Sequence, residues 1–141
     1  MNRIIAGLTL ASAAVPAAAS EAATMRFACS EASATPGQPP ELAGLWDVLM
    51  DVGGNPQFGL LTLGMSGTEL AGSIAFPATG VVVVRSLTFD GRTVTLIVAS
   101  REGDVRFDGS LAADGARMCG IVSYHRGQKF EMIAQKRADR G

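Results

Sequence analysis

The sequence predicts an all-β fold, an eight-stranded antiparallel up-and-down β-barrel preceded by a signal peptide and an extended N-terminal arm. From residue 42 onward the chain is a series of short apolar or alternating runs rich in β-branched residues. Short turn-forming segments separate these runs, and no stretch after residue 42 has both the length and the period of a helix. Because an open meander leaves two exposed edges, closure into a barrel is the favoured arrangement.

Residues 1–22 have the pattern of a secretory signal peptide. One arginine precedes an apolar run from Ile4 to Val15, and small residues suited to cleavage follow. This run is too short to anchor the chain across a bilayer, so we expect a periplasmic or secreted protein with no membrane span. Residues 23–41 are expected to form an extended arm that prolines stiffen near its end, and residues 138–141 a tail.

Residues 42–137 form the predicted barrel domain. Its expected strands, in chain order, are 44–51 (GLWDVLMD), 57–65 (QFGLLTLGM), 69–76 (ELAGSIAF), 81–89 (VVVVRSLTF), 93–100 (TVTLIVAS), 104–111 (DVRFDGSL), 116–124 (ARMCGIVSY) and 129–136 (KFEMIAQK). The separators GGNP, SGT, PATG, DGR, REG, AADG and HRGQ are short enough for hairpins, so consecutive strands should pair antiparallel. The sixth strand shows the alternation best, since Val105 and Phe107 alternate with Arg106 and Asp108.

The same alternation, carried round the barrel, predicts which side chains point inward. They are Trp46, Val48, Met50, Leu61, Leu63, Ile74, Phe76, Leu87, Phe89, Val94, Leu96, Val98, Val105, Phe107, Leu111, Val122, Tyr124, Phe130 and Met132. An eight-stranded barrel has room for little more than its own side chains or one small ligand. Because four phenylalanines and the tryptophan are on the inward face, we expect a largely filled interior.

Trp46, the only tryptophan, lies at the start of the first strand. Asp47 and Asp51 mark the opposite face as the wet one, so Trp46 should point inward. In an up-and-down barrel with an even number of strands, the last strand ends beside the start of the first. This brings Lys136 and Arg137 to Trp46, where a cation over the indole would help to close this end of the barrel.

The opening Gly44-Leu45-Trp46, together with Lys136 or Arg137 at the end of the last strand, resembles the signature of the calycin group, which includes lipocalins, fatty-acid-binding proteins and avidins. The run LAGLWDV followed by GTELAGSIAFPATG is also similar in rhythm to the opening of avidin-like chains. The resemblance implies the barrel and the end-plugging role of the tryptophan. It does not imply biotin binding, because the further tryptophans that line an avidin site are absent.

Arg85 breaks the apolar pattern of the run VVVVRSLTF. Alternation places it on the inward face, where a guanidinium needs a carboxylate or an anionic ligand. One hypothesis is that Arg85 and Tyr124 hold the acidic head of a small amphiphile, whose tail meets Phe76, Val98 and Phe130 near the open end. The alternatives are an internal ion pair, or a bulge or register shift that turns Arg85 to solvent.

The charge and the cysteines indicate a chain without nucleic-acid or redox chemistry. A net charge of −1 offers no basic face to nucleic acid and no polybasic segment to a lipid surface. Cys29 and Cys119 can pair in an exported protein, so we expect a disulfide between them. A redox or metal-binding thiol is the alternative, but the chain lacks a C-x-x-C motif and a neighbouring ligand set.

No catalytic constellation is found in the sequence. Nucleophilic catalysis needs a nucleophile and a base oriented by a third group, and the only histidine, His125, lies in a hairpin turn, where we expect it to be solvated. The glycines lie in hairpins that no helix follows, so they form no phosphate loop, and no acidic run has the spacing of a calcium loop. We therefore expect neither an enzyme nor a cofactor or metal.

Three functional classes stay open. The first is a binder of a small apolar or anionic amphiphilic ligand. The second is a structural or protein-interaction module with a filled barrel, in which Val82 and Val84 would be outward apolar residues that contact a partner. The third is a protease inhibitor of calycin type, with a free arm that enters the protease cleft. A cavity above roughly 300 Å³ that opens at the hairpin end would favour the first class over the second.

Overall fold

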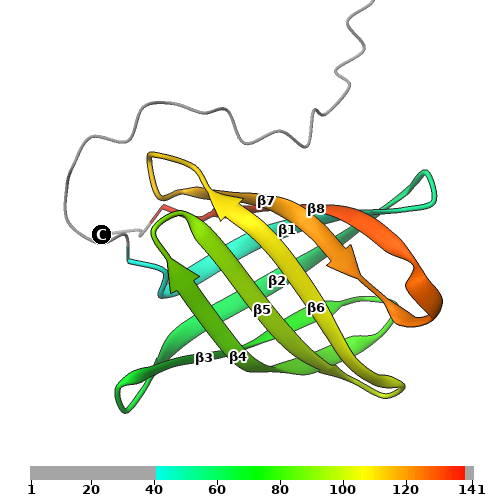
Figure 1. Cartoon of the computed structure of the whole chain (residues 1–141), viewed down its shortest axis with the longest axis horizontal. Coiled ribbons are helices and arrows are strands. Elements are labelled where there is room, and N and C mark those ends of the chain that lie inside the picture. The colour runs from blue at the N-terminus through cyan, green and yellow to red at the C-terminus, as the bar shows by residue number, and fades with distance from the viewer. Residues whose placement is uncertain (1–40, 139–141) are drawn as a thin grey trace, which may run out of the picture.

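The computed structural model describes residues 41–138. They form a closed barrel in which each strand pairs antiparallel with the next and β8 pairs with β1 (Figure 1). The strands are β1 (Gly44–Val52), β2 (Asn55–Ser66), β3 (Glu69–Phe76), β4 (Gly80–Asp90), β5 (Thr93–Ser100), β6 (Gly103–Leu111), β7 (Arg117–Ser123) and β8 (Lys129–Lys136). The predicted all-β, eight-stranded, antiparallel up-and-down barrel is confirmed.

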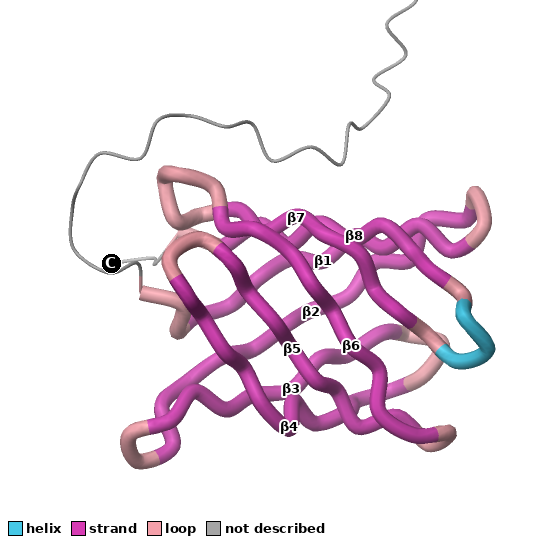
Figure 2. The backbone as a smooth tube through the Cα atoms, in the orientation of Figure 1, coloured by secondary structure: helices cyan, strands magenta, loops and turns pink. Residues whose placement is uncertain are grey.

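The strands end where the sequence provides turn residues, at most two positions from the expected ends. The β1–β2 turn shows the cause, because Gly53 and Gly54 have φ angles of 61° and 85°, which favour glycine. The Gly54 N–H also donates to Asp51 Oδ1 at 2.7 Å. The β7–β8 connection differs, since it contains the short 3₁₀ helix His125–Gly127 (Figure 2). Short connections therefore alternate between the two ends of the barrel.

Several predictions fall on residues outside the described part of the chain. The signal peptide, residues 1–22, is one of them. The arm is another, apart from its last residue, and so is the tail beyond Ala138. These segments stay predictions.

The half of the barrel nearest the start of β1 is filled with side chains. The largest fully buried side chains are Trp46, Val48, Leu61, Val94, Leu96 and Met118. All residues predicted to point inward belong to the buried core or pack against it, so that prediction is confirmed. Other residues also belong to the core or pack against it, namely Leu42, Leu70, Val82, Val84, Met118 and Ala134.

A β-bulge interrupts strand β4. The register of the β4–β5 ladder shifts between Val84 and Ser86, so that Arg85 is an extra residue without a partner in this ladder. Arg85 and Ser86 are both exposed, whereas Val84 is buried and Leu87 packs against the core. Even-numbered residues of β4 therefore point inward before the bulge and odd-numbered residues after it. Simple alternation cannot predict both segments at once.

The bulge decides two predictions for β4. Arg85 points outward, which confirms the alternative of a bulge that turns it to solvent, and the hypothesis of an inward Arg85 is wrong. Val82 and Val84 point inward, although the interaction hypothesis needed them outside. The outward valines are instead Val81 and Val83, which are 71% and 60% exposed.

Candidate functional site

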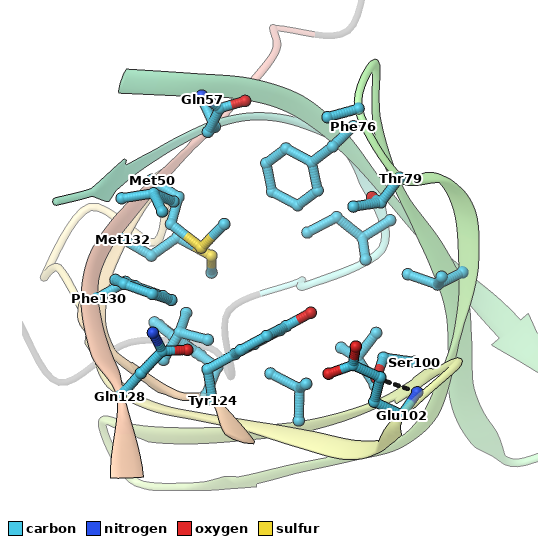
Figure 3. A pocket seen from close by; sticks show the side chains of 18 of the residues that line it. Met50, Gln57, Phe76, Thr79, Ser100, Glu102, Tyr124, Gln128, Phe130 and Met132 are labelled. Atoms are coloured by element: carbon cyan, nitrogen blue, oxygen red, sulfur yellow. Dashed lines mark hydrogen bonds between the residues drawn. The ribbon is translucent and has the colours of Figure 1, made fainter. Parts of the chain in front are cut away.

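The half of the barrel at the β1–β2 turn encloses a cavity of about 700 Å³. Residues of three turns at this end, among them Ala78, Arg101 and Gln128, line its mouth. The expectation of a largely filled interior is therefore wrong. Figure 3 shows the reason, because the rings of Phe76 and Phe130 stand at the wall and leave the centre open.

Apolar side chains from most of the strands make the wall of the cavity. They are Met50, Val52, Ile74, Phe76, Val82, Val98, Val105, Phe107, Val122, Phe130 and Met132. Four of the five predicted ligand residues, Phe76, Val98, Tyr124 and Phe130, lie on this wall, and Arg85 does not. Sequence reasoning missed Val82 as a lining residue because the bulge reverses the parity of β4.

Gly59 in β2 sets the direction of the Phe76 ring. A Cβ atom at Gly59 would lie 2.7 Å from the Phe76 ring and equally close to the Ala75 carbonyl oxygen. Any larger residue would therefore displace both the ring and the backbone of β3. The absence of a side chain at Gly59 therefore leaves the space beside β2 that the Phe76 ring occupies.

Tyr124 is the polar residue that reaches furthest into the cavity. Its hydroxyl points towards the centre (Figure 3), and no hydrogen bond to that hydroxyl is found among residues 41–138. The ring centroid lies 5.9 Å from that of Phe130 and 4.5 Å from that of His125. Its backbone N–H donates to the Gln128 carbonyl at 2.8 Å. The phenol is thus held in place by its neighbours while its hydroxyl is available.

A small polar cluster joins two turns at the mouth. His125 Nε2 lies 2.9 Å from Ser100 Oγ and 4.0 Å from Glu102 Oε2. Ser100 Oγ donates to the Gly103 carbonyl at 2.7 Å, so it accepts from the Nε2–H of His125. The His125 side chain is 19% exposed, and the expectation of a solvated turn histidine is therefore wrong. Sequence reasoning missed this contact because it joins separate hairpins.

Arg85 lies on the outer face of the barrel, where it forms an ion pair with Asp104 of β6. Its Nε is 3.0 Å from Asp104 Oδ1, and the two side chains are 62% and 51% exposed. An exposed pair of this kind contributes little to stability. The acidic head of a ligand inside the cavity therefore has no contact with this guanidinium.

The opposite end of the barrel is closed by Trp46. The indole is fully buried, and its Nε1–H donates to the Leu42 carbonyl at 3.0 Å. Lys136 Nζ lies 5.9 Å from the ring centroid and donates to the Glu41 carbonyl at 2.7 Å. Gly44 leaves room for this lysine, because a Cβ there would lie 2.8 Å from Lys136 Cε. These contacts cover the indole on the side that faces the end of the barrel.

Arg137 does not join Lys136 at the indole but binds Asp47 on the outer face. Its Nη2 donates to Asp47 Oδ1 at 2.6 Å, and its Nε lies 3.0 Å from both carboxylate oxygens. The hydrogen bonds from Arg137 lower the pKa of Asp47, and they raise that of Arg137. The pair links β1 to the residue that follows β8.

Three further features bear on function, namely metal-ligating clusters, long apolar helices and the predicted disulfide. No group of three or more histidine, cysteine or acidic side chains able to hold a metal ion is found among residues 41–138. In the same range, no helix is long and apolar enough to span a bilayer. Cys119 lies in β7 and is 7% exposed, but Cys29 is outside the described residues. Their disulfide stays a prediction.

No protein-family model matches the chain, and no curated protein matches it either. The geometry of the barrel and its cavity is therefore the guide to function.

Proposed function

We propose that the protein binds a small, largely apolar ligand inside the open half of the barrel. The observation that carries this proposal is the cavity of about 700 Å³ with apolar walls and a mouth at one end. Sites for small molecules in proteins commonly have volumes of roughly 300–1,000 Å³ and this kind of lining. Apolar surface in contact with water is unfavourable, so a ligand that covers it gains roughly 25 cal/mol for each Å² removed from water.

The arrangement of polar groups supports an amphiphilic ligand rather than a pure hydrocarbon. The wall is apolar at depth, where Ile74 and Phe107 lie, whereas Ser100, Gln128 and Thr79 line the mouth. An apolar tail would thus lie at depth, and the polar group of the ligand would lie in the outer part of the cavity, within reach of Tyr124. The closed end at Trp46 gives the ligand a single way in.

The proposal predicts that a larger side chain that fills the cavity weakens ligand binding. Val82 and Val83 are neighbours in β4, but Val82 lines the cavity whereas Val83 is 60% exposed on the outer face. We expect Val82→Trp to weaken binding of Nile red, an uncharged fluorescent dye, by about tenfold or more, and Val83→Trp to leave it unchanged. Fluorescence titration measures both affinities, and far-UV circular dichroism checks the barrel.

Val98→Phe, which fills the cavity from β5, provides a second test if Val82→Trp does not fold. Equal binding by the filled and the outward variants would contradict the proposal, as would a wild-type protein that binds no apolar probe. Native mass spectrometry of protein purified from its own cells would identify a retained ligand.

We also propose that the chain is a calycin-like protein, that it acts in the periplasm or after secretion, and that it is not an enzyme. The barrel with an indole at the start of β1 and Lys136 near its ring supports the first statement. The signal-peptide pattern of residues 1–22 supports the second. For the third, Ser100 and Glu102 approach the same nitrogen of His125, whereas a catalytic triad uses both ring nitrogens.

A second candidate function is contact with a protein partner through the outer face of β2–β4. Phe58, Val81 and Val83 are 64%, 71% and 60% exposed on this face. Exposed apolar groups that lie close together often mark interaction sites. The two functions use different sides of the sheet and are compatible. The inhibitor hypothesis depends on the arm, which lies outside the described residues, and it stays a prediction.

A further inference from the structure

The cavity wall has almost no charge. Its charged lining residues within the described range are Arg101 and Glu102, which are consecutive, opposite in sign and located in the β5–β6 turn. Both residues are exposed, and the Glu102 side chain is 73% exposed. Their charges therefore lie in water at the mouth and largely cancel. Deeper in the cavity, neither a cation nor an anion is available to a ligand.

The bulge in β4 is the reason for this neutrality. It turns Arg85 to the outer face, where the guanidinium pairs with Asp104. Val84 is buried at the preceding position, and Val82 lines the cavity. An apolar surface thus occupies the place where alternation would have put a positive charge.

Apart from Arg101 and Glu102, the groups of the cavity that can form hydrogen bonds with a ligand are uncharged. The Tyr124 hydroxyl points into the open centre (Figure 3), and as a phenol it can both donate and accept a hydrogen bond. Gln57 and Gln128, whose amide groups are also uncharged, line the cavity as well. A ligand group that reaches the Tyr124 hydroxyl therefore meets an uncharged partner.

From these observations we infer that the ligand is uncharged, with one hydrogen-bonding group that pairs with the Tyr124 hydroxyl. Suitable chemical classes are medium-chain alcohols, ketones, esters and carboxylic acids in their protonated form. An ionised head brought to the same place would lose its hydration without gaining a counter-charge, which is strongly unfavourable. This inference rests on the proposed function and restricts it, since it replaces the anionic amphiphile with a neutral one.

A series of ligands with one tail and different heads tests the inference. Decanol, decanoate and decylammonium are compared at neutral pH by displacement of Nile red from the wild-type protein. We expect decanol to bind about tenfold more tightly than either ion, because only the ions must be desolvated without compensation. Equal or tighter binding of decanoate or decylammonium would overturn the inference.

Lowering the pH provides an independent measurement on the same protein. Protonation converts decanoate to the neutral acid, so its apparent affinity should rise as the pH falls through the pKa of the acid. Decanol carries no titrating group, and its affinity at each pH corrects for changes in the protein. A decanoate affinity that follows that of decanol at every pH would contradict the inference.

Two variants test whether the ligand forms its hydrogen bond with the Tyr124 hydroxyl. Tyr124→Phe removes only the hydroxyl, and we expect it to weaken decanol binding about fivefold while binding of naphthalene, which has no polar group, is unchanged. Arg85→Gln removes a cation on the outer face, away from the cavity, and should leave decanol binding unchanged. Unaltered decanol binding by Tyr124→Phe would overturn the role of the hydroxyl.

Failure of the proposed function and failure of the neutral ligand class give different binding results. If the wild type binds neither Nile red nor naphthalene nor decanol, the proposed function is wrong. If naphthalene and decanoate both bind, and decanoate binds at least as tightly as decanol, the cavity is a binding site but the neutral ligand class is wrong.

Discussion

Single side chains determine how each end of the barrel behaves. Trp46 is fully buried and its indole N–H has a carbonyl partner, so this end excludes water without an unpaired polar group. Tyr124 has the contrasting arrangement at the other end, because its ring is supported while its hydroxyl faces the cavity. The two residues have similar size and polarity, and their surroundings give them different roles.

Replacement of Trp46 should destabilise the barrel. We expect Trp46→Phe to lower the free energy of unfolding by about 2–4 kcal/mol, since it leaves a void and removes the hydrogen bond to Leu42. Leu45→Phe, one position earlier on the outer face, should change it by less than about 0.5 kcal/mol. Urea denaturation followed by far-UV circular dichroism measures both free energies of unfolding. Equal effects of the two substitutions would contradict the role of Trp46 in closing this end of the barrel.

The Asp108 carboxylate should make stability depend on pH. Hydrogen bonds from Arg106 mainly, and from Thr95, lower the pKa of Asp108 in the folded barrel. A carboxyl whose pKa is lower when folded contributes stability above its unfolded pKa of about 3.9, and this contribution is lost as the pH falls towards the folded value.

Asp108→Asn should therefore reduce the loss of stability between neutral pH and about pH 3. Asp90→Asn is the control, since no ion pair of Asp90 is found among residues 41–138. Urea midpoints at several pH values measure the effect. Identical pH profiles for Asp108→Asn and the wild type would show that the lowered pKa has no consequence for folding.

At the scale of the element, the bulge in β4 decides which residues face the cavity. Deletion of Arg85 would remove the extra residue of the bulge. Val84 and Leu87 would then be two positions apart and could both point inward in a regular strand. Deletion of Thr88, which pairs regularly with Thr95, would instead turn the end of the strand over and expose Phe89.

We therefore expect the Arg85 deletion to keep a β-sheet spectrum and a cooperative thermal transition, and the Thr88 deletion to lose the transition. Circular dichroism during heating measures both. Loss of folding in the Arg85 deletion alone would mean that the bulge itself, through its curvature, is needed for closure.

At the scale of the whole molecule, the sequence predicts the barrel well but the cavity poorly. The strand ends could be predicted because glycine and aspartate mark the turns locally, as at Gly53 and Gly54. Closure could be predicted because eight strands without crossovers leave two edges to pair. These features depend on short-range chemistry and on period, which a sequence displays directly.

The candidate site depends on information that the sequence does not display. The run VVVVRSLTF is apolar at successive positions, so a change of parity at Arg85 could be named as one alternative but not chosen from the sequence. The open volume depends on how the rings of Phe76 and Phe130 turn against their strands, and the contact between Ser100 and His125 joins distant hairpins. The wall residues Phe76, Val98, Tyr124 and Phe130 could still be predicted from alternation.

The separation of the barrel into a filled and a hollow half has a practical consequence. The chain contains one tryptophan and one tyrosine, and they lie in different halves. The emission of Trp46 can thus report the folded fraction, while the ring resonances of Tyr124 report occupancy, without any label. Folding and ligand uptake can therefore be followed separately in one unmodified sample.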